Sequence, residues 1–304
     1  MDKSKDDVYI EVEDKDPVWL KDKGDHFFRR ADFTSAINAY SKALKADPEF
    51  LTGRLNRATC FIKLRAFEMA VDDCNDITDQ IGKLKEEDFE LDKEFYQKIM
   101  ARTIVKRAAA LVWCSKFDHA VEDMDTVLNS DVYKAVIGDK DCATLHKDKA
   151  RVQIRMRSNL IKAEGDKCFY NENIDEAAAK YHEALQEDQE NEYAMANISV
   201  IHLKKLEYDE SIRYATQALQ IVNQFQNETK SFTKNNVLEI KLLLRRAKSY
   251  EMKSEWELSK ADLDKVIMLE PKNSEAIGAL KIVTNKLDSI MFNKYREEAN
   301  ELLK

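Results

Sequence analysis

Apolar residues recur every three to four positions along most of the chain, which predicts helices that bury one face. From Pro17 the pattern is organised in a unit of 34 residues, with small residues at its positions 8 and 20 and larger apolar residues between them. The first unit reads Gly24, Phe27, Ala36, Tyr40, Ala43 and Pro48. Units in the same frame begin at Leu51, Ala101, Ser158, Glu192 and Ile240. Each unit predicts two antiparallel helices, because small residues at both positions let the helix axes approach closely.

This arrangement is identified as the tetratricopeptide signature, a helix-turn-helix repeat of 34 residues. The sequence therefore predicts an all-α tetratricopeptide-repeat superhelix with six repeats in two sets of three, plus capping helices. A single repeat cannot bury its own apolar face, so three stacked repeats form the smallest stable unit.

The spacing of the repeats predicts three segments: a flexible acidic segment over 1–16, a first three-repeat domain with a capping helix over 17–157, and a second over 158–304. In each half the extra residues precede the third repeat. The charged insert 82–97 is expected to continue as exposed helix, and the polar insert 223–236 to form a loop. Residues 8–12, VYIEV, are a candidate short strand, and the unbroken helical period before Gly165 predicts a rigid connection between the halves.

Composition narrows the class of protein further. With only 6 Gly and 3 Pro and 35% charged residues, the chain favours helices throughout. A net charge of -8 argues against nonspecific binding of nucleic acid.

No signal peptide is evident, and the longest apolar run, 108–114, is too short to cross a bilayer, so we expect a cytoplasmic protein that contacts no membrane. The five cysteines form no C-x-x-C pair and are interpreted as reduced core residues.

Motifs that would indicate catalysis are missing from the sequence. The five histidines lack metal-ligand spacing, and no Gly-rich phosphate loop or nucleophile signature occurs. We therefore expect no enzyme, no cofactor and no metal site.

One constellation of polar residues occurs in both halves. The first set is Lys21, Gly24, Asp25, Asn56, Arg102 and Lys106, and the second is Lys162, Gly165, Asp166, Asn197, Lys241 and Arg245. These residues fall on the first helices of successive repeats, which line the groove of such a solenoid. The last two cations of each set are one helical turn apart and point the same way. Three cations and an amide that converge suit a ligand with two adjacent carboxylates.

The constellation resembles the dicarboxylate clamp of co-chaperone tetratricopeptide domains. In that family a Lys, two Asn, a Lys and an Arg bind the C-terminal Glu-Glu-Val-Asp tail of the seventy- and ninety-kilodalton heat-shock chaperones. Lys21 matches the first Lys and Asn56 the second Asn, whereas Arg102 and Lys106 match the final pair with the cations exchanged. Lys162, Asn197, Lys241 and Arg245 match in the second half. The resemblance implies that chaperone tails are the partners.

The first half is also similar to the tetratricopeptide domain of the dyslexia-associated axonemal dynein assembly factors. The similarity is carried by PVWLKDKGDHFFRRADFTSAINAYSKAL over 17–44, by LNRATCFIKL and by VKRAAAL. It implies a cytoplasmic co-chaperone for dynein arms of motile cilia, with association with the cilium and with dynein assembly factors or dynein chains as further partners. The N-terminal p23-like domain of that family has no counterpart in this sequence.

Both halves depart from the clamp at the first Asn, where this chain has Asp25 and Asp166. Such an acid would repel a ligand carboxylate ~4 Å away by about 1 to 4 kcal/mol. Alternatively, each Asp pairs with the Lys four residues before it. Two functions stay open: an adaptor that docks chaperone tails, and a structural scaffold that binds folded partners without a carboxylate clamp.

Overall fold

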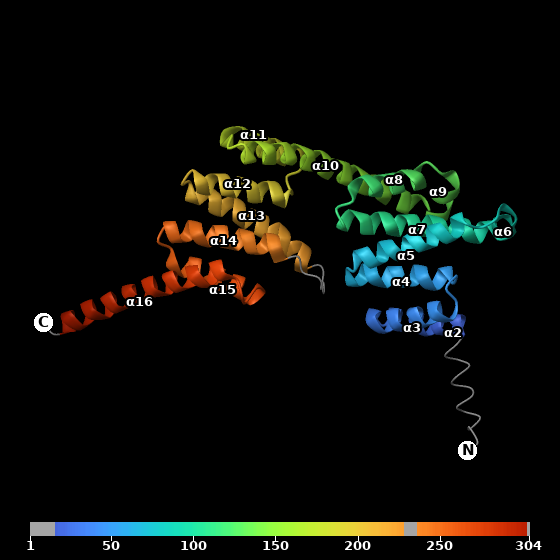
Figure 1. Ribbon diagram of the computed structural model, residues 1–304, viewed down its shortest axis with the longest axis horizontal. Coiled ribbons are helices and arrows are strands. Elements are labelled where there is room, and N and C mark those ends of the chain that lie inside the picture. Colours follow the sequence, from blue (N-terminus) through green and yellow to red (C-terminus); the bar gives the residue numbers. More distant parts are fainter. Residues whose placement is uncertain (1–15, 228–235, 303–304) are drawn as a thin grey trace, which may run out of the picture. The chain divides into compact units, whose positions relative to one another are not determined.

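The computed structural model describes residues 16–227 and 236–302, which form fifteen helices and no strand within these ranges (Figure 1). The candidate strand at 8–12 and most of the candidate loop at 223–236 lie outside the described residues. The chain divides into two compact units, one ending at Gln153 and the other beginning at Ile154. We call them unit 1 and unit 2 and describe each by itself.

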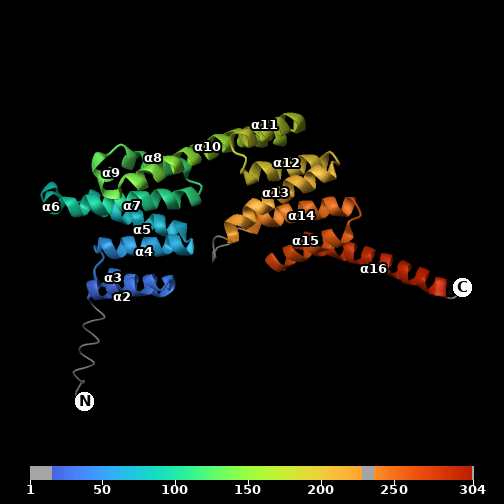
Figure 2. The ribbon, with the colours of Figure 1, turned by 180° about the vertical axis from the view of Figure 1, so that it is seen from behind.

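Unit 1 consists of three antiparallel helix pairs followed by capping helices. The pairs are α2 (Pro17–Arg29) with α3 (Phe33–Ala46), α4 (Leu51–Leu64) with α5 (Phe67–Gly82), and α7 (Lys93–Trp113) with α8 (Phe117–Leu128). The short helix α6 (Glu86–Leu91) precedes α7, and α9 (Asp131–Ile137) and the start of α10 (Asp139–Tyr170) follow α8. The pairs lie side by side in chain order, as Figures 1 and 2 show from opposite sides.

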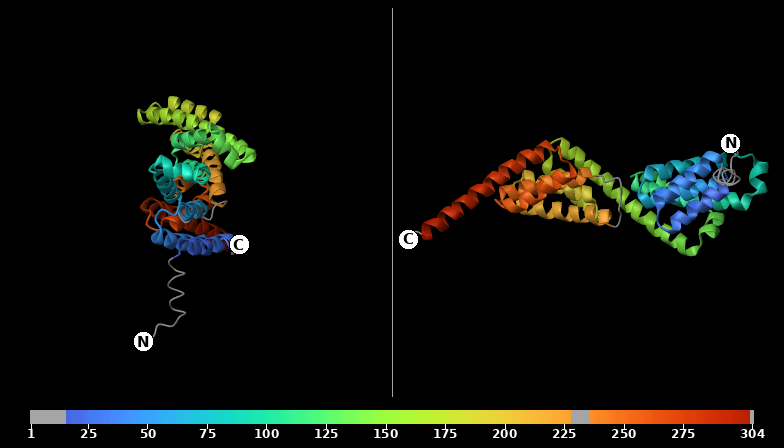
Figure 3. Two further views of the ribbon diagram at one scale, coloured as in Figure 1. Left: turned by 90° about the vertical axis from the view of Figure 1, so that its right-hand side faces the viewer. Right: turned by 90° about the horizontal axis from the view of Figure 1, so that it is seen from below.

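Unit 2 repeats this plan. The end of α10 pairs with α11 (Ile174–Glu187), α12 (Glu192–Lys204) with α13 (Tyr208–Asn227), and α14 (Asn236–Met252) with α15 (Trp256–Leu269). The last helix, α16 (Ser274–Leu302), packs on α15 with its first half and then extends beyond the other helices of unit 2 (Figure 3). The six helix pairs confirm the predicted repeats in two sets of three with capping helices.

The turns between the paired helices have one backbone conformation in all six repeats. Among the described residues, the non-glycine residues with positive φ are the fifteenth residues of the six repeats, with φ between 58° and 63°: Ala31, Arg65, Ser115, Glu172, Leu206 and Ser254. At such a residue the helix ends in a left-handed turn that satisfies its last carbonyls. After α4, for example, the Arg65 and Ala66 amides donate to the carbonyls of Ile62 and Phe61.

Small side chains mark the closest helix contacts. The residues at position 20 of the six repeats are fully buried: Ala36, Ala70, Ala120, Ala177, Ser211 and Ser259. At position 8, Gly24 lies against the ring of Tyr40, and a Cβ built on Gly24 would come within 2.5 Å of that ring. Gly165 lies in the same way against Tyr181, with a closest distance of 2.7 Å. A glycine is required at both positions because the tyrosine ring fills the space of a side chain.

The insert before the third repeat does not continue as one exposed helix, so that prediction is wrong in part. Helix α5 ends at Gly82, α6 is separate, and α7 begins at Lys93. The physical reason is that Phe89 and Tyr96 stack on each other, with ring centroids 5.7 Å apart, and pack against the apolar cluster around Ile77. Partial burial of these two rings turns the insert back onto the core.

Two of the five cysteines occupy the core. Cys60 and Cys74 are fully buried, and burial raises the pKa of each thiol to about 12. Cys114, Cys142 and Cys168 are only partly buried, so the interpretation of all five as core residues was too broad. No disulfide joins any of them. Among the described helices, none is both long enough and apolar enough to cross a membrane.

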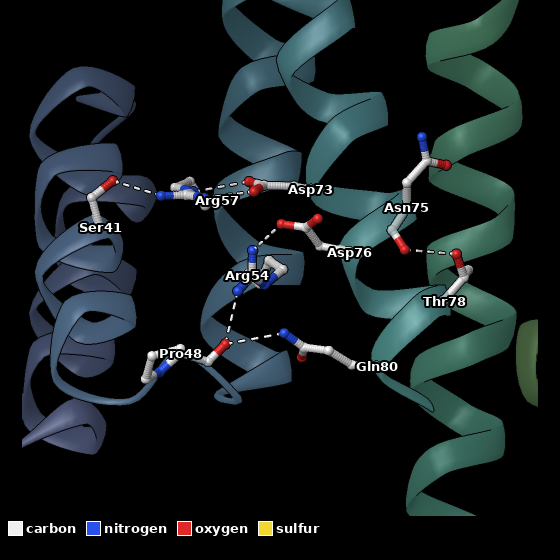
Figure 4. Close-up of polar contacts among 9 residues, drawn as sticks. All are labelled: Ser41, Pro48, Arg54, Arg57, Asp73, Asn75, Asp76, Thr78 and Gln80. Atoms are coloured by element: carbon white, nitrogen blue, oxygen red, sulfur yellow. Dashed lines mark hydrogen bonds and ion pairs between the residues drawn. The ribbon is translucent and has the colours of Figure 1, made fainter. Parts of the chain in front are cut away.

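Paired Arg and Asp side chains join the two helices of three repeats. Arg57 of α4 donates through Nε and Nη2 to both carboxylate oxygens of Asp73 in α5, at 2.9 and 2.6 Å, and its Nη1 reaches Ser41 of α3 (Figure 4). The same two-bond pairs form between Arg107 and Asp123 and between Arg246 and Asp262. The three Asp side chains are nearly buried, so these pairs fix how the helices of a repeat meet.

Candidate functional site

A groove with a volume of about 690 Å³ lies in unit 1 and contains four of the five predicted clamp residues: Asp25 from α2, Asn56 from α4, and Arg102 and Lys106 from α7. The fifth, Lys21, lies beside the groove and contacts Asp25. Residues far apart in the sequence meet here because the first helix of each repeat faces the groove.

Asp25 is the centre of a hydrogen-bond network. Its Oδ2 accepts a hydrogen bond from Lys21 Nζ at 2.7 Å. Its Oδ1 accepts from the hydroxyl of Tyr40 at 2.6 Å and from Nδ2 of Asn56 at 2.9 Å. Burial, followed by the bond to Asp25, raises the pKa of Tyr40 and keeps its hydroxyl a donor. The pairing of Asp25 with Lys21, one of the two alternatives drawn from the sequence, is therefore present.

Arg102 and Lys106 are the two predicted clamp cations that take no part in the hydrogen-bond network around Asp25. Neither side chain has a hydrogen bond or an ion pair with any residue that the structure describes. Arg102 is exposed to solvent, and Lys106 is partly buried. Burial lowers the pKa of Lys106, and the nearby positive charges of Lys63 and Arg102 lower it further. A negative ligand group would relieve this uncompensated charge.

The remaining wall of the groove is largely apolar. Its apolar residues are Phe28 of α2, Leu55 of α4, Val105 of α7, and Val136 and Ile137 of α9, and Tyr40 and Thr59 add two hydroxyl groups. Arg29 and Asp141 are the other charged residues that line it. Sequence reasoning missed the part contributed by α9 and α10, because a capping helix carries no repeat signature.

Unit 2 has a smaller groove, with a volume of about 160 Å³, at the equivalent place. The predicted residues Lys162, Asn197, Lys241 and Arg245 line it, together with Tyr193, Ala196, Val237 and Leu238. Asp166 does not line it but binds two of the residues that do, Lys162 and Asn197. Its carboxylate accepts from Lys162 Nζ at 2.6 Å, from the hydroxyl of Tyr181 at 2.9 Å and from Nδ2 of Asn197 at 2.8 Å.

The cation pair of unit 2 differs from that of unit 1 in one respect. Arg245 donates from Nη1 to the carbonyl of Ala196 at 2.8 Å, and burial lowers its pKa. Lys241 is exposed, with no partner in the described part of the chain. Unit 2 therefore offers fewer free donors than unit 1.

Tyr40 and Tyr181 are the functional residues that sequence reasoning placed only in the core. Their separation of 141 positions equals that of Asp25 from Asp166 and of Asn56 from Asn197. This shared offset is the signal that would have assigned the tyrosines to the duplicated constellation.

Comparisons with known proteins agree with the repeat architecture. The family model "Tetratricopeptide repeat" matches residues 21–82. The Hsp70-Hsp90 organizing protein of Triticum aestivum is 23% identical over 227 residues, which cover 72% of this chain and 37% of that protein. Dynein axonemal assembly factor 4 of Pongo pygmaeus is 39% identical over 64 residues, which cover 21% of this chain and 15% of that protein.

Among solved structures, the tetratricopeptide domain of P58(IPK) has the same fold, with a TM-score of 0.51 at 15% identity. The match covers 95% of this chain and 71% of that one. The chain spans little more than a third of the length of the wheat relative. The repeat frame, the buried small residues and these similarities identify a tetratricopeptide-repeat chain that is homologous to Hsp70-Hsp90 organizing proteins and, over 64 residues, to dynein axonemal assembly factor 4.

Proposed function

We propose that this chain is a non-enzymatic, cytoplasmic adaptor that binds the acidic C-terminal tails of the seventy- and ninety-kilodalton heat-shock chaperones. One observation carries the proposal: Arg102 and Lys106 face a groove of about 690 Å³ without a partner among the described residues. A partly buried cation without a counter-ion is costly, and a carboxylate supplies what it lacks. The names of the Hsp70-Hsp90 organizing relatives support the same class of partner.

The apolar wall of the groove fits a short peptide better than a free anion. Next to the cation pair, the side chains of Phe28, Val105 and Ile137 offer apolar surface to an aliphatic residue of the ligand. A tail that ends in Glu-Glu-Val-Asp carries both groups, a valine and a free carboxylate, within two residues.

A role in the cytoplasmic pre-assembly of axonemal dynein arms for motile cilia is the finer part of the proposal. It is supported by the 39% identity to dynein axonemal assembly factor 4, which lies within 64 residues of this chain. Dynein assembly factors or dynein chains would then be further partners, and part of the protein would be associated with the cilium.

Charge reversal in each groove tests the proposal. We expect Lys106→Glu to weaken binding of a fluorescent peptide ending in Glu-Glu-Val-Asp to the unit 1 groove at least tenfold, since it replaces attraction by repulsion. Lys241→Glu should do the same for the unit 2 groove. Lys98→Glu is the matched control, because Lys98 is an exposed residue of the same helix as Lys106 and does not line the groove.

The full-length chain and its variants are titrated by fluorescence anisotropy, and circular dichroism verifies their helicity. The proposal is wrong if the double variant Lys106→Glu with Lys241→Glu binds the peptide as tightly as the parent chain does. That result would favour a scaffold that binds folded partners without a carboxylate clamp.

A further inference from the structure

The donors that converge on Asp25 are the groups that a second ligand carboxylate would need. Lys21 Nζ, the hydroxyl of Tyr40 and Nδ2 of Asn56 lie 2.7, 2.6 and 2.9 Å from the Asp25 oxygens. A carboxylate accepts about four hydrogen bonds in all, so Asp25 is nearly saturated by its own chain. The Asp25 carboxylate of the protein therefore takes the place of one of the two ligand carboxylates that a clamp of this kind would bind.

The charge at this end of the groove also disfavours a second acidic group. Lys21 Nζ lies 3.0 Å from Asp22 Oδ1 as well as 2.7 Å from Asp25 Oδ2, so one positive charge faces two negative ones. Hydrogen bonding to Asp25 is the main cause that raises the pKa of Lys21, which keeps it charged and paired. Lys21, Asp22 and Asp25 together carry a net negative charge, which an incoming carboxylate would meet at Lys21.

The other end of the groove presents positive charge, and Arg29, an exposed residue one turn after Asp25 on α2, is a further cation of the lining. Arg102 and Lys106 lie one helical turn apart on α7 and have no anionic partner within the described ranges. Between the two ends, Asn56 donates to Asp25 through Nδ2, which leaves its side-chain oxygen as an acceptor for a donor of the ligand. The complementary ligand has one carboxylate and, beside it, a neutral hydrogen-bond donor.

The same hydrogen bonds occur in unit 2, which indicates that the arrangement around Asp25 is not accidental. Asp166 receives hydrogen bonds from Lys162, Tyr181 and Asn197 at 2.6, 2.9 and 2.8 Å, from positions equivalent to those around Asp25. Two grooves whose surrounding residues differ therefore share one internal carboxylate with three matching donors.

We infer that each groove binds a peptide through a single carboxylate, the free main-chain carboxylate of the last residue, and accepts a neutral donor such as Asn as that residue's side chain. This inference rests on the proposed function and narrows its ligand class. Asp25 and Asp166 act as specificity-determining residues that remove the requirement for a terminal acidic side chain.

Three peptides separate this inference from the proposed function. They share one sequence up to Glu-Glu-Val and then end in Asp with a free carboxylate, in Asn with a free carboxylate, or in Asn with an amide. We titrate the full-length chain with each peptide by calorimetry, and we repeat the titrations with the double variant Asp25→Asn with Asp166→Asn.

For the parent chain we expect the Asp and Asn free acids to bind within about threefold of each other, and the Asn amide at least tenfold more weakly. The double variant should prefer the Asp peptide over the Asn peptide at least fivefold, because Lys21 and Asn56 then lose their internal carboxylate.

If the parent chain binds the Asp peptide at least tenfold more tightly than the Asn free acid, the single-carboxylate inference is wrong and the proposed function stands. If the Asn amide binds as well as the Asn free acid, or if no peptide binds, the proposed function fails as well. An unchanged preference in a folded double variant overturns the role assigned to Asp25 and Asp166.

Discussion

Replacing Lys106 by Met should stabilise unit 1 while it weakens peptide binding there. Lys106 has no partner in the described part of the chain, burial lowers its pKa, and the charges of Lys63 and Arg102 act in the same direction. The folded state therefore disfavours its charge. Methionine keeps a flexible unbranched side chain of similar length, so the substitution removes the charge and leaves no large cavity.

The size of the effect follows from the position of Lys106. Its side chain is partly buried, so the cost of its unpaired charge is smaller than for a fully buried ion. Substitutions that relieve such a cost at functional sites commonly raise the free energy of unfolding by about 1 kcal/mol. For a unit of this size that gain corresponds to a rise in Tm of about 3 °C.

Urea unfolding of the full-length chain in a Trp256→Phe background measures this effect, because Trp19 and Trp113 then report on unit 1 alone. Lys98→Met is the matched control and should change the free energy of unfolding by less than about 0.5 kcal/mol. If Lys106→Met instead lowers the stability of unit 1 by about 1 kcal/mol or more, Lys106 is part of a structural ion pair and the reasoning is refuted.

The stabilising effect of Lys106→Met should depend on pH with a defined sign. The folded-state pKa of Lys106 is lowered from its ordinary 10.5, so the unfolded chain binds more protons between the two values. The loss of folding stability caused by the Lys106 charge is complete below the folded-state pKa and disappears as the pH rises through 10.5. The stability difference between Lys106→Met and the parent chain should therefore shrink above neutral pH, whereas a difference independent of pH would exclude a charge effect.

Two further substitutions test the packing and the paired charges that hold the repeats together. Gly24→Ala should lower the free energy of unfolding by about 1 to 3 kcal/mol, because the added methyl would overlap the buried ring of Tyr40. The control Gly82→Ala meets no atom within 4 Å and should be neutral or slightly stabilising. Equal effects of the two substitutions in thermal unfolding would contradict the close contact. Asp123→Ala should lower the free energy of unfolding by about 3 kcal/mol, because it leaves Arg107 without its carboxylate in a nearly buried pair. The control Glu122→Ala, at an exposed residue of the same helix, should lower it by less than about 0.5 kcal/mol. A loss below 1 kcal/mol for Asp123→Ala in urea unfolding would mean that the pair does not fix the two helices.

The repeat frame was predictable from the sequence because it depends on local rules. A small residue such as Ala36 or Ser211 is needed wherever two helix axes approach, so its spacing appears directly in the sequence. The left-handed residue at position 15 was not predictable, since Arg65 and Leu206 have no intrinsic preference for positive φ. Packing of the two helices on either side imposes that conformation.

The candidate site was predictable in its members but not in its connections. The duplicated spacing brought Asp25, Asn56, Arg102 and Lys106 to one groove, as expected for the first helices of successive repeats. The donors that bind Asp25 include the hydroxyl of Tyr40, which comes from a second helix. Side-chain packing sets the position of that hydroxyl, and the sequence pattern does not show it. The turn of the insert at Phe89 likewise depends on a long-range apolar contact that charge patterning could not reveal.

The most direct test of the central claim compares a free terminal carboxylate with its amide on the full-length chain. Calorimetric titration uses one peptide ending in Glu-Glu-Val-Asp in both forms, at low and physiological salt. We predict a Kd of ~10 μM for the free acid, roughly -7 kcal/mol, and a loss of at least tenfold on amidation, with both affinities lower at higher salt. Equal binding of the two forms would contradict the account, because Arg102 and Lys106 would then not be holding the end of the chain.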